Sequence, residues 1–222
     1  MARLAKLAWV CMCLSVFPLG ASAQTPSQAP VSPPSACERL HDSLALSTAI
    51  NPRALDGRLL DRAVRVETNQ RRCQAGLPSL GPSEALALEA TRHALALADG
   101  RAVAHESSEP GRETAERRVQ KAGFRYASAE NVAWYPWMDF PDTGFTEDPS
   151  LGACGYRDAQ GRPIAPMSYA RFAQRVVDAW MGSPGHKDAI LFAEVDAVGV
   201  GVSFDAEAPN CGNLHVVQMF GG

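Results

Sequence analysis

Neither sign of charge forms a block in this sequence, and acidic and basic residues are interspersed along its length. It has 21 Lys and Arg against 24 Asp and Glu, which gives a formal net charge of −3. Nucleic-acid-binding domains usually carry a basic patch or stripe, so the composition argues against a nucleic-acid partner. The sequence also lacks internal repeats, and after residue 23 it has no apolar run long enough to span a membrane.

Common catalytic motifs are missing as well. No Cys-x-x-Cys pair occurs, which excludes zinc ribbons and thioredoxin-type redox sites. Gly182-Ser183-Pro184-Gly185 has the wrong spacing for the nucleophile elbow of hydrolases. His105-Glu106 begins like a metalloprotease signature, but Glu109 stands where the second histidine is required. No catalytic residue can therefore be assigned from these motifs, and their absence favours a protein that is not an enzyme.

The first 23 residues predict a secretory signal peptide. Arg3 and Lys6 precede an apolar run over residues 7–19, and Ala21-Ser22-Ala23 supplies a small-residue cleavage site. The run is shorter than the roughly 20 residues that span a bilayer, so we expect cleavage after Ala23 and a secreted or periplasmic protein. Residues 24–36 are rich in Pro, Ser and Ala and predict a flexible linker. A single domain, expected to be monomeric, then covers residues 37–222.

Four cysteines remain after the signal peptide: Cys37, Cys73, Cys154 and Cys211. An even number in an oxidising compartment predicts two disulfides. Four cysteines allow three pairings, and the sequence does not choose among them. We favour Cys37 with Cys73 and Cys154 with Cys211, because each bond then links two residues in the same half of the domain.

Hydrophobic periodicity predicts helices first and strands last. Helical spacing covers four ranges: 56–74, 83–99, 114–121 and 168–181. From residue 198 valines alternate with Gly199 and Gly201, which predicts a strand to residue 204, and a second strand is expected over 214–220. This order is typical of an α+β fold. Residues 134–167 show no clean period and predict an irregular excursion held down by Cys154.

Five motifs follow one another from about residue 61 to the C-terminus. They are Asn69 with Gly76-Leu77-Pro78-Ser79-Leu80; His105; Gly123 with Glu130-Asn131-Val132-Ala133; Trp180 with Ser183-Pro184-Gly185-His186 and Ile190-Leu191; and Gly199 and Gly201 with Gln218-Met219-Phe220-Gly221. In this order they resemble the bacterial branch of the CAP superfamily, named for cysteine-rich secretory proteins, antigen 5 and pathogenesis-related proteins, which contains SCP-like extracellular domains. The resemblance implies an α-β-α sandwich around a three-stranded antiparallel sheet, with the third strand near residues 130–135.

The resemblance also implies a polar cavity. His105, Glu130 and His186 match cavity positions that hold a divalent metal, for which zinc is the first expectation and magnesium or calcium the alternatives. Eukaryotic members of the family often place a second acidic residue at the cavity position that Ser183 takes in this chain, which leaves three metal ligands. Bacterial relatives often have an asparagine where this chain has Ala189. Each of the three residues also has a structural interpretation: a loop histidine, a carboxylate that caps a turn, and a histidine at a helix-terminating turn.

Three functional hypotheses follow. We favour a non-enzymatic extracytoplasmic binding module whose cavity takes an ion, a lipid or a cell-envelope component. The second is a metal-assisted hydrolase or peptidase that works through His105, His186 and Glu130, with Ser107 or Ser183 as nucleophile. The third is a protein-interaction module in which aromatic residues of the excursion anchor a partner. Those residues, which we expect mainly to pack the excursion onto the domain, are Trp134, Tyr135, Trp137 and Phe140. His93 is expected to be structural, and His41 and His215 receive no role.

Overall fold

The computed structural model describes residues 44–222, so the predicted signal peptide, the linker and Cys37 lie outside the described residues. The elements are, in chain order, the 3-10 turns η1 (Leu44–Ser47) and η2 (Pro52–Ala54), α1 (Gly57–Gln74), β1 (Gly81–Pro82), α2 (Glu84–Gly100), α3 (Ala115–Lys121), β2 (Ser128–Pro136), β3 (Phe145–Glu147), η3 (Pro149–Leu151), β4 (Tyr156–Asp158), α4 (Tyr169–Met181), α5 (Pro184–Ile190), β5 (Ala197–Asp205) and β6 (Asn213–Gly221). The predicted α+β class is confirmed. None of the helices described is both long and apolar enough to cross a bilayer.

The four predicted helices begin at residues whose side chains cap them. In α1, α2, α3 and α4 the capping oxygen accepts a hydrogen bond from a backbone N–H three residues further on. This satisfies one of the N–H groups that a helix start leaves unpaired. The capping residues are Asp56, Ser83, Thr114 and Ser168. Because these signals are local, the sequence placed the helix starts well.

The turn predicted to end α4 also begins a further helix. Ser183 stands at the N-cap position of α5, and Pro184 is its first residue. Proline is favourable there because its missing N–H would have had no partner in the first turn. His186 therefore lies in the first turn of α5 and not in an isolated turn.

The main sheet has four strands in the order β1-β5-β6-β2. The pairs β5 with β6 and β6 with β2 are antiparallel along their whole lengths, as the three-stranded prediction required. The difference is β1, whose residues Gly81 and Pro82 pair in parallel with the start of β5. Two residues are too few to show a strand period, so the sequence carried no signal for this strand.

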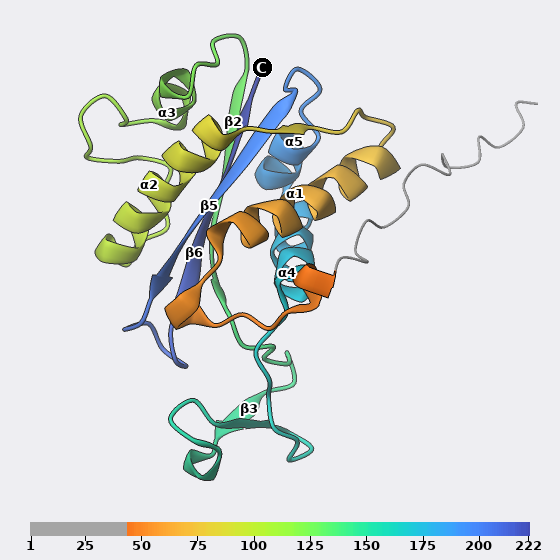
Figure 1. The fold of residues 1–222 in the computed structure, drawn as a ribbon, viewed down its shortest axis with the longest axis vertical. Coiled ribbons are helices and arrows are strands. Elements are labelled where there is room, and N and C mark those ends of the chain that lie inside the picture. The colour runs from red at the N-terminus through yellow and green to blue at the C-terminus, as the bar shows by residue number, and fades with distance from the viewer. Residues whose placement is uncertain (1–43) are drawn as a thin grey trace, which may run out of the picture. The chain divides into compact units, whose positions relative to one another are not determined.

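Helices cover both faces of this sheet, with α2 and α3 on one face and α1, α4 and α5 on the other (Figure 1). Each face has its own apolar core. The core under α2 includes Leu86, Ala90, Val132, Val217 and Met219. The core under α1 and α4 includes Val64, Phe172, Trp180, Val200 and Phe220. Neighbouring residues of a strand point to opposite faces, so each strand contributes side chains to both cores. With helices on both faces of the sheet, the layers of the predicted α-β-α sandwich are confirmed.

Two glycines of β5 allow α2 to pack directly against the sheet. A Cβ atom at Gly199 would overlap the backbone of α2 at residues 86 and 87, and one at Gly201 would overlap it at residues 90 and 91. The alternation of glycine with valine in β5 thus has a physical reason. The glycines of β5 face the backbone of α2, and Val198 and Val200 on the other side of the strand pack into the core under α1 and α4.

The irregular excursion begins later than predicted, after Pro136, because Trp134 and Tyr135 belong to β2. It contains a small two-stranded sheet of β3 and β4. The rings of Phe140 and Phe145 stack with centroids 4.1 Å apart, and Tyr156 meets Phe140 edge-on at 5.1 Å. The excursion therefore has its own aromatic cluster.

A disulfide joins Cys154 of the excursion to Cys211 of the β5–β6 connection, with Cα atoms 5.8 Å apart, which is one of the two pairings that we favoured. Cys73 is also disulfide-bonded, and its predicted partner Cys37 lies outside the described residues. Next to the Cys154–Cys211 disulfide, the buried Trp137 donates a hydrogen bond from Nε1 to the Cys211 carbonyl oxygen at 2.9 Å. These contacts support a packing role for Trp137.

Acid is expected to destabilise the fold through His215. This side chain of β6 is buried, and burial lowers its pKa below the ordinary value of 6.5. The unfolded chain takes up a proton near pH 6.5, whereas the folded chain does so only at lower pH, so the unfolded state binds more protons between these values. The stability is therefore complete above about pH 6.5. It is lost as the pH falls toward the lowered pKa of the folded state.

Thermal unfolding of the wild-type protein and of His215→Gln between about pH 7.5 and pH 5 measures this contribution. The melting temperature of the wild type is expected to fall more steeply with acid, because glutamine does not titrate. Burial also lowers the pKa values of His93 and His186, so the variant keeps part of the pH dependence. Equal slopes in the two proteins would show that His215 does not contribute.

Candidate functional site

The three residues predicted for the cavity meet at the edge strand β2. His105 lies in the loop between α2 and α3, Glu130 on β2, and His186 in the first turn of α5. The rings of His105 and His186 have their centroids 6.5 Å apart at an interplanar angle of 45°. His105 Nδ1 lies 3.0 Å from Glu130 Oε1. Three segments that are distant in the sequence therefore come together at one edge of the sheet.

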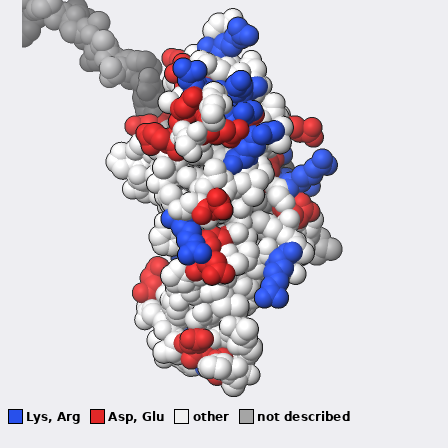
Figure 2. Space-filling view, turned by 90° about the vertical axis from the view of Figure 1, so that its left-hand side faces the viewer, with Lys and Arg blue, Asp and Glu red and all other residues white. Residues whose placement is uncertain are grey.

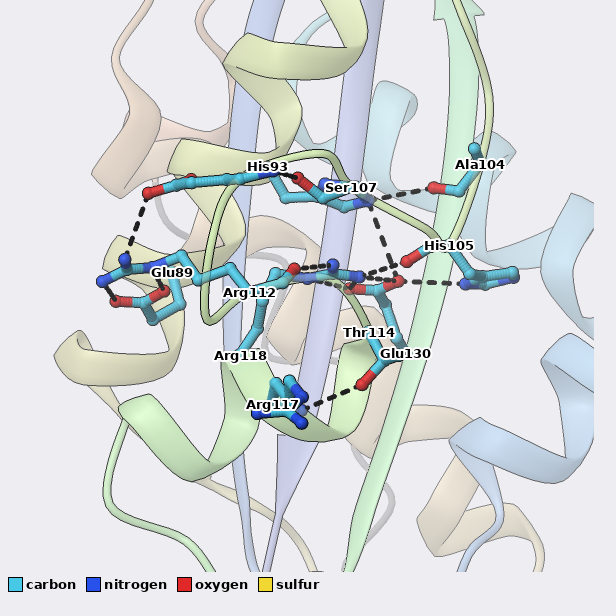
Figure 3. Close-up of polar contacts among 11 residues, drawn as sticks. Glu89, His93, Ala104, His105, Ser107, Arg112, Thr114, Arg117, Arg118 and Glu130 are labelled. Atoms are coloured by element: carbon cyan, nitrogen blue, oxygen red, sulfur yellow. Dashed lines mark hydrogen bonds and ion pairs between the residues drawn. The ribbon is translucent and has the colours of Figure 1, made fainter.

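Glu130 is held by Arg118, a residue of α3 that the sequence analysis did not select (Figure 3). The guanidinium Nε lies 3.1 Å from Oε2, and Nη2 lies 2.8 Å from Oε1 and 2.7 Å from Oε2. Both side chains are only 1% exposed. A buried ion pair of this kind is expensive to break, because removing one partner leaves an uncompensated charge away from water.

Arg118 also holds the loop that carries His105. Its Nη2 donates to the His105 carbonyl oxygen at 2.7 Å, and its Nη1 donates to the Arg112 carbonyl oxygen at 2.9 Å. Arg112 in turn pairs with Glu89 of α2 through contacts of 2.5 Å and 3.0 Å. One buried cation thus links α3, the loop over residues 105–112 and β2.

The bond to Glu130 decides which nitrogen of His105 is available. With Nδ1–H donating to the carboxylate, the neutral ring keeps its lone pair on Nε2. The side chain is 51% exposed, and in Figure 3 its ring faces the Glu130 carboxylate with one nitrogen while the rest of the ring lies on the far side of Glu130 from Arg118. The hydrogen bond that His105 donates to Glu130 raises the pKa of His105, whereas burial and then the charge of His105 lower the pKa of His186.

His186 is positioned from the opposite face of β2. Asn131, the neighbour of Glu130 on this strand, donates from Nδ2 to the His186 carbonyl oxygen at 3.2 Å. The same amide nitrogen lies 3.2 Å from Gln218 Oε1, and Gln218 Nε2 donates to Thr68 Oγ1 at 2.7 Å. This buried row of polar side chains connects α5 to the sheet and to α1. The motif contained Asn131, but only the structure shows what it contacts.

The two serines considered as nucleophiles are not engaged with the histidines. The Ser107 hydroxyl accepts a hydrogen bond from the Glu109 N–H at 3.1 Å, and Ser183 makes no side-chain capping bond. Within residues 44–222, neither hydroxyl is hydrogen-bonded to the ring of His105 or His186. His93 is buried and its Nε2 lies 2.9 Å from the Ala104 carbonyl oxygen, as befits a structural histidine.

The donor set fits a metal ion only in part. In the portion of the chain that the structure describes, no three His, Cys, Asp or Glu side chains are grouped to hold a metal. Glu130 does not fit as a ligand, because a second cation on its carboxylate would lie against the Arg118 guanidinium. His105 does fit as a ligand, since a carboxylate on the second ring nitrogen is the usual partner of a metal-ligating histidine, and the ring of His186 lies next to it. Imidazole suits zinc, whereas magnesium and calcium prefer oxygen ligands and do not fit.

Three solved bacterial structures are similar to this chain. An outer surface protein of Borrelia burgdorferi is 19% identical, with 72% of this chain and 90% of that chain covered and a TM-score of 0.47. An extracellular protein of Bacillus anthracis containing an SCP domain is 18% identical, with 79% and 45% covered and a TM-score of 0.51. A cysteine-rich secretory protein of Staphylococcus aureus is 17% identical, with 74% and 38% covered and a TM-score of 0.42.

Identities this low indicate a shared fold alone, and the Bacillus anthracis structure carries that likeness. This chain spans less than half the length of the Bacillus anthracis and Staphylococcus aureus proteins. No curated protein matches it. Residues 67–220 match the CAP family, described as the cysteine-rich secretory protein family. Because that match covers well over half of the sequence, the chain belongs to the CAP family.

Proposed function

We propose that this chain is an extracytoplasmic binding module whose ligand contacts the histidine pair His105 and His186. The predicted signal peptide supports export, and the Bacillus anthracis protein of similar fold is described as extracellular. The visible face carries acidic and basic side chains side by side (Figure 2). A strongly charged macromolecule therefore finds no field of one sign on that face to attract it.

One observation carries the proposal: the hydrogen bond from His105 Nδ1 to Glu130, at 3.0 Å, on a ring that is half exposed beside His186. It fixes the ring and leaves Nε2 free to contact a ligand. The loop that carries His105 is tied to β2, because Arg118 binds the Glu130 carboxylate and the loop backbone together. A pre-organised imidazole costs less conformational entropy when it binds.

The ligand that best suits this pair is a divalent cation of the zinc type. In a tetrahedral site two nitrogens bound to one zinc ion lie about 3.4 Å apart, so the two rings, whose centroids are 6.5 Å apart, would have to move closer together to share an ion. A bound zinc ion would supply a positive charge and open coordination positions for water or for a polar group of an envelope component. With two protein ligands, the affinity is expected to be weaker than that of a closed structural site.

Isothermal titration of the folded protein with zinc chloride tests this proposal. We expect one zinc site, and a loss of affinity of about tenfold or more in His105→Ala and in His186→Ala. Titration with magnesium or calcium chloride is expected to show no such site. Lys187→Ala serves as the matched control, because it removes an exposed side chain next to His186 without removing an imidazole. Zinc binding that survives both histidine substitutions, or no zinc binding at all, would contradict the proposal.

The hydrolase and protein-interaction hypotheses have less support. Neither Ser107 nor Ser183 is hydrogen-bonded to a histidine that could activate it, as far as the described residues show. Of the four aromatic residues considered as anchors, Trp137 and Phe140 are buried and only Trp134 is more than half exposed. Binding through the histidine pair remains the function that we put forward.

A further inference from the structure

The guanidinium of Arg118 occupies the position on Glu130 that a metal ion would need. We propose that Arg118 determines the specificity of the site by keeping Glu130 away from the ligand. Only the two imidazoles are then left for contact with it. This inference rests on the proposed function, since it specifies which ligands the histidine pair can accept.

The first argument is the number of acceptor positions on the carboxylate. An ionised carboxylate has two oxygens with about four lone-pair sites. Arg118 contacts both oxygens, through Nε on Oε2 and through Nη2, which lies within hydrogen-bond distance of Oε1 and Oε2. His105 Nδ1 takes a further position on Oε1. Both carboxylate oxygens of Glu130 are therefore already engaged by donors of the protein, and the side chain is 1% exposed.

The second argument is that Arg118 has little freedom to leave. Its guanidinium is 1% exposed and also donates to the carbonyl oxygens of His105 and Arg112. Moving it would leave these carbonyls and Glu130 without their donor in a buried region, at a cost for each unsatisfied group. Placing a divalent ion beside it would instead bring two positive charges together at low dielectric. Displacing Arg118 and placing a metal ion beside it are both unfavourable. Glu130 therefore positions His105 and does not contact the ligand.

A consequence for selectivity follows. Without a carboxylate, the site offers nitrogen donors only, which suit zinc and other borderline cations. Manganese, magnesium and calcium prefer oxygen ligands, so they are excluded. Replacing the guanidinium with an apolar side chain would return Glu130 to the site as an oxygen ligand.

The experiment is titration of Arg118→Met with zinc chloride and with manganese chloride, the latter followed by the electron paramagnetic resonance of free Mn²⁺. We expect zinc affinity to rise by about tenfold or more, and manganese binding to appear that the wild type lacks. Arg118→Met/Glu130→Gln is expected to lose both gains, because glutamine supplies no anionic oxygen. Arg118→Lys is the matched control, and it should show no gain because the cation on Glu130 is retained.

Each outcome separates the inference from the proposed function. If the wild type binds zinc through its histidines but Arg118→Met gains nothing, the inference fails and the proposed function stands. If the wild type binds no zinc, the proposed function fails, while a gain in Arg118→Met that depends on Glu130 still supports the role of Arg118. If Arg118→Met does not fold, manganese binding to the wild type is the test. Manganese binding to the wild type that is lost in Glu130→Gln would overturn the inference. No manganese binding to the wild type would support it.

Discussion

Gly201→Ala is expected to lower the free energy of unfolding by about 3 kcal/mol or more. The new Cβ atom would overlap the backbone of α2 at Ala90 and Thr91, and a backbone segment cannot move aside as a flexible side chain can. The helix would have to shift away from β5, which opens gaps in the core that contains Leu86 and Val217. Urea denaturation followed by circular dichroism measures the change.

Gly100→Ala is the matched control for this substitution. Gly100 is the last residue of α2, and a Cβ atom there would meet nothing within 4 Å. Alanine favours a helix over glycine by up to about 1 kcal/mol, so this variant is expected to be as stable as the wild type or slightly more stable. If Gly201→Ala proved as stable as Gly100→Ala, α2 would not be packed against β5 as closely as the structure shows.

Breaking the pair between Arg118 and Glu130 is expected to have the second large effect. Arg118→Met or Glu130→Leu alone should cost about 3 to 5 kcal/mol, because each leaves a buried charge without its partner. The double variant removes both charges, so its cost should be smaller than the sum of the two single costs by about 2 kcal/mol or more. A double-mutant cycle of chemical denaturation measures this difference.

A control pair joins α3 to the residue just before its N-cap. Arg117 and Glu113 are 3.5 Å apart, and their side chains are 61% and 49% exposed. Water solvates these charges whether or not they are paired, so a double-mutant cycle at this pair is expected to show no measurable coupling, although Glu113 also accepts a hydrogen bond from the Gly111 N–H. Additive costs at Arg118 and Glu130 would contradict a buried pair. A comparable effect at the exposed pair would mean that α3 itself, and not the ion pair, had been damaged.

The elements that the sequence predicted are those whose signals are local. Helix starts follow from a capping side chain and the apolar spacing after it, and Ser83 and Ser168 show both. The strands β5 and β6 follow from a period of two. The elements that it missed have no such signal. Strand β1 has two residues, and the seven residues of α5 are too few to show a helical period.

The site also contains residues that were selected from the sequence and one that only the structure shows. His105, Glu130 and His186 were selected through the resemblance to the CAP family, not from their spacing in the sequence, and the structure brings them to one edge of the sheet. The sequence did not select Arg118, because an arginine in a short polar helix looks the same whether it faces water or a buried carboxylate. Its partner stands twelve residues away on another element. Burial and pairing are created only when α3 packs against β2, so the tertiary structure alone decided that Glu130 supports His105.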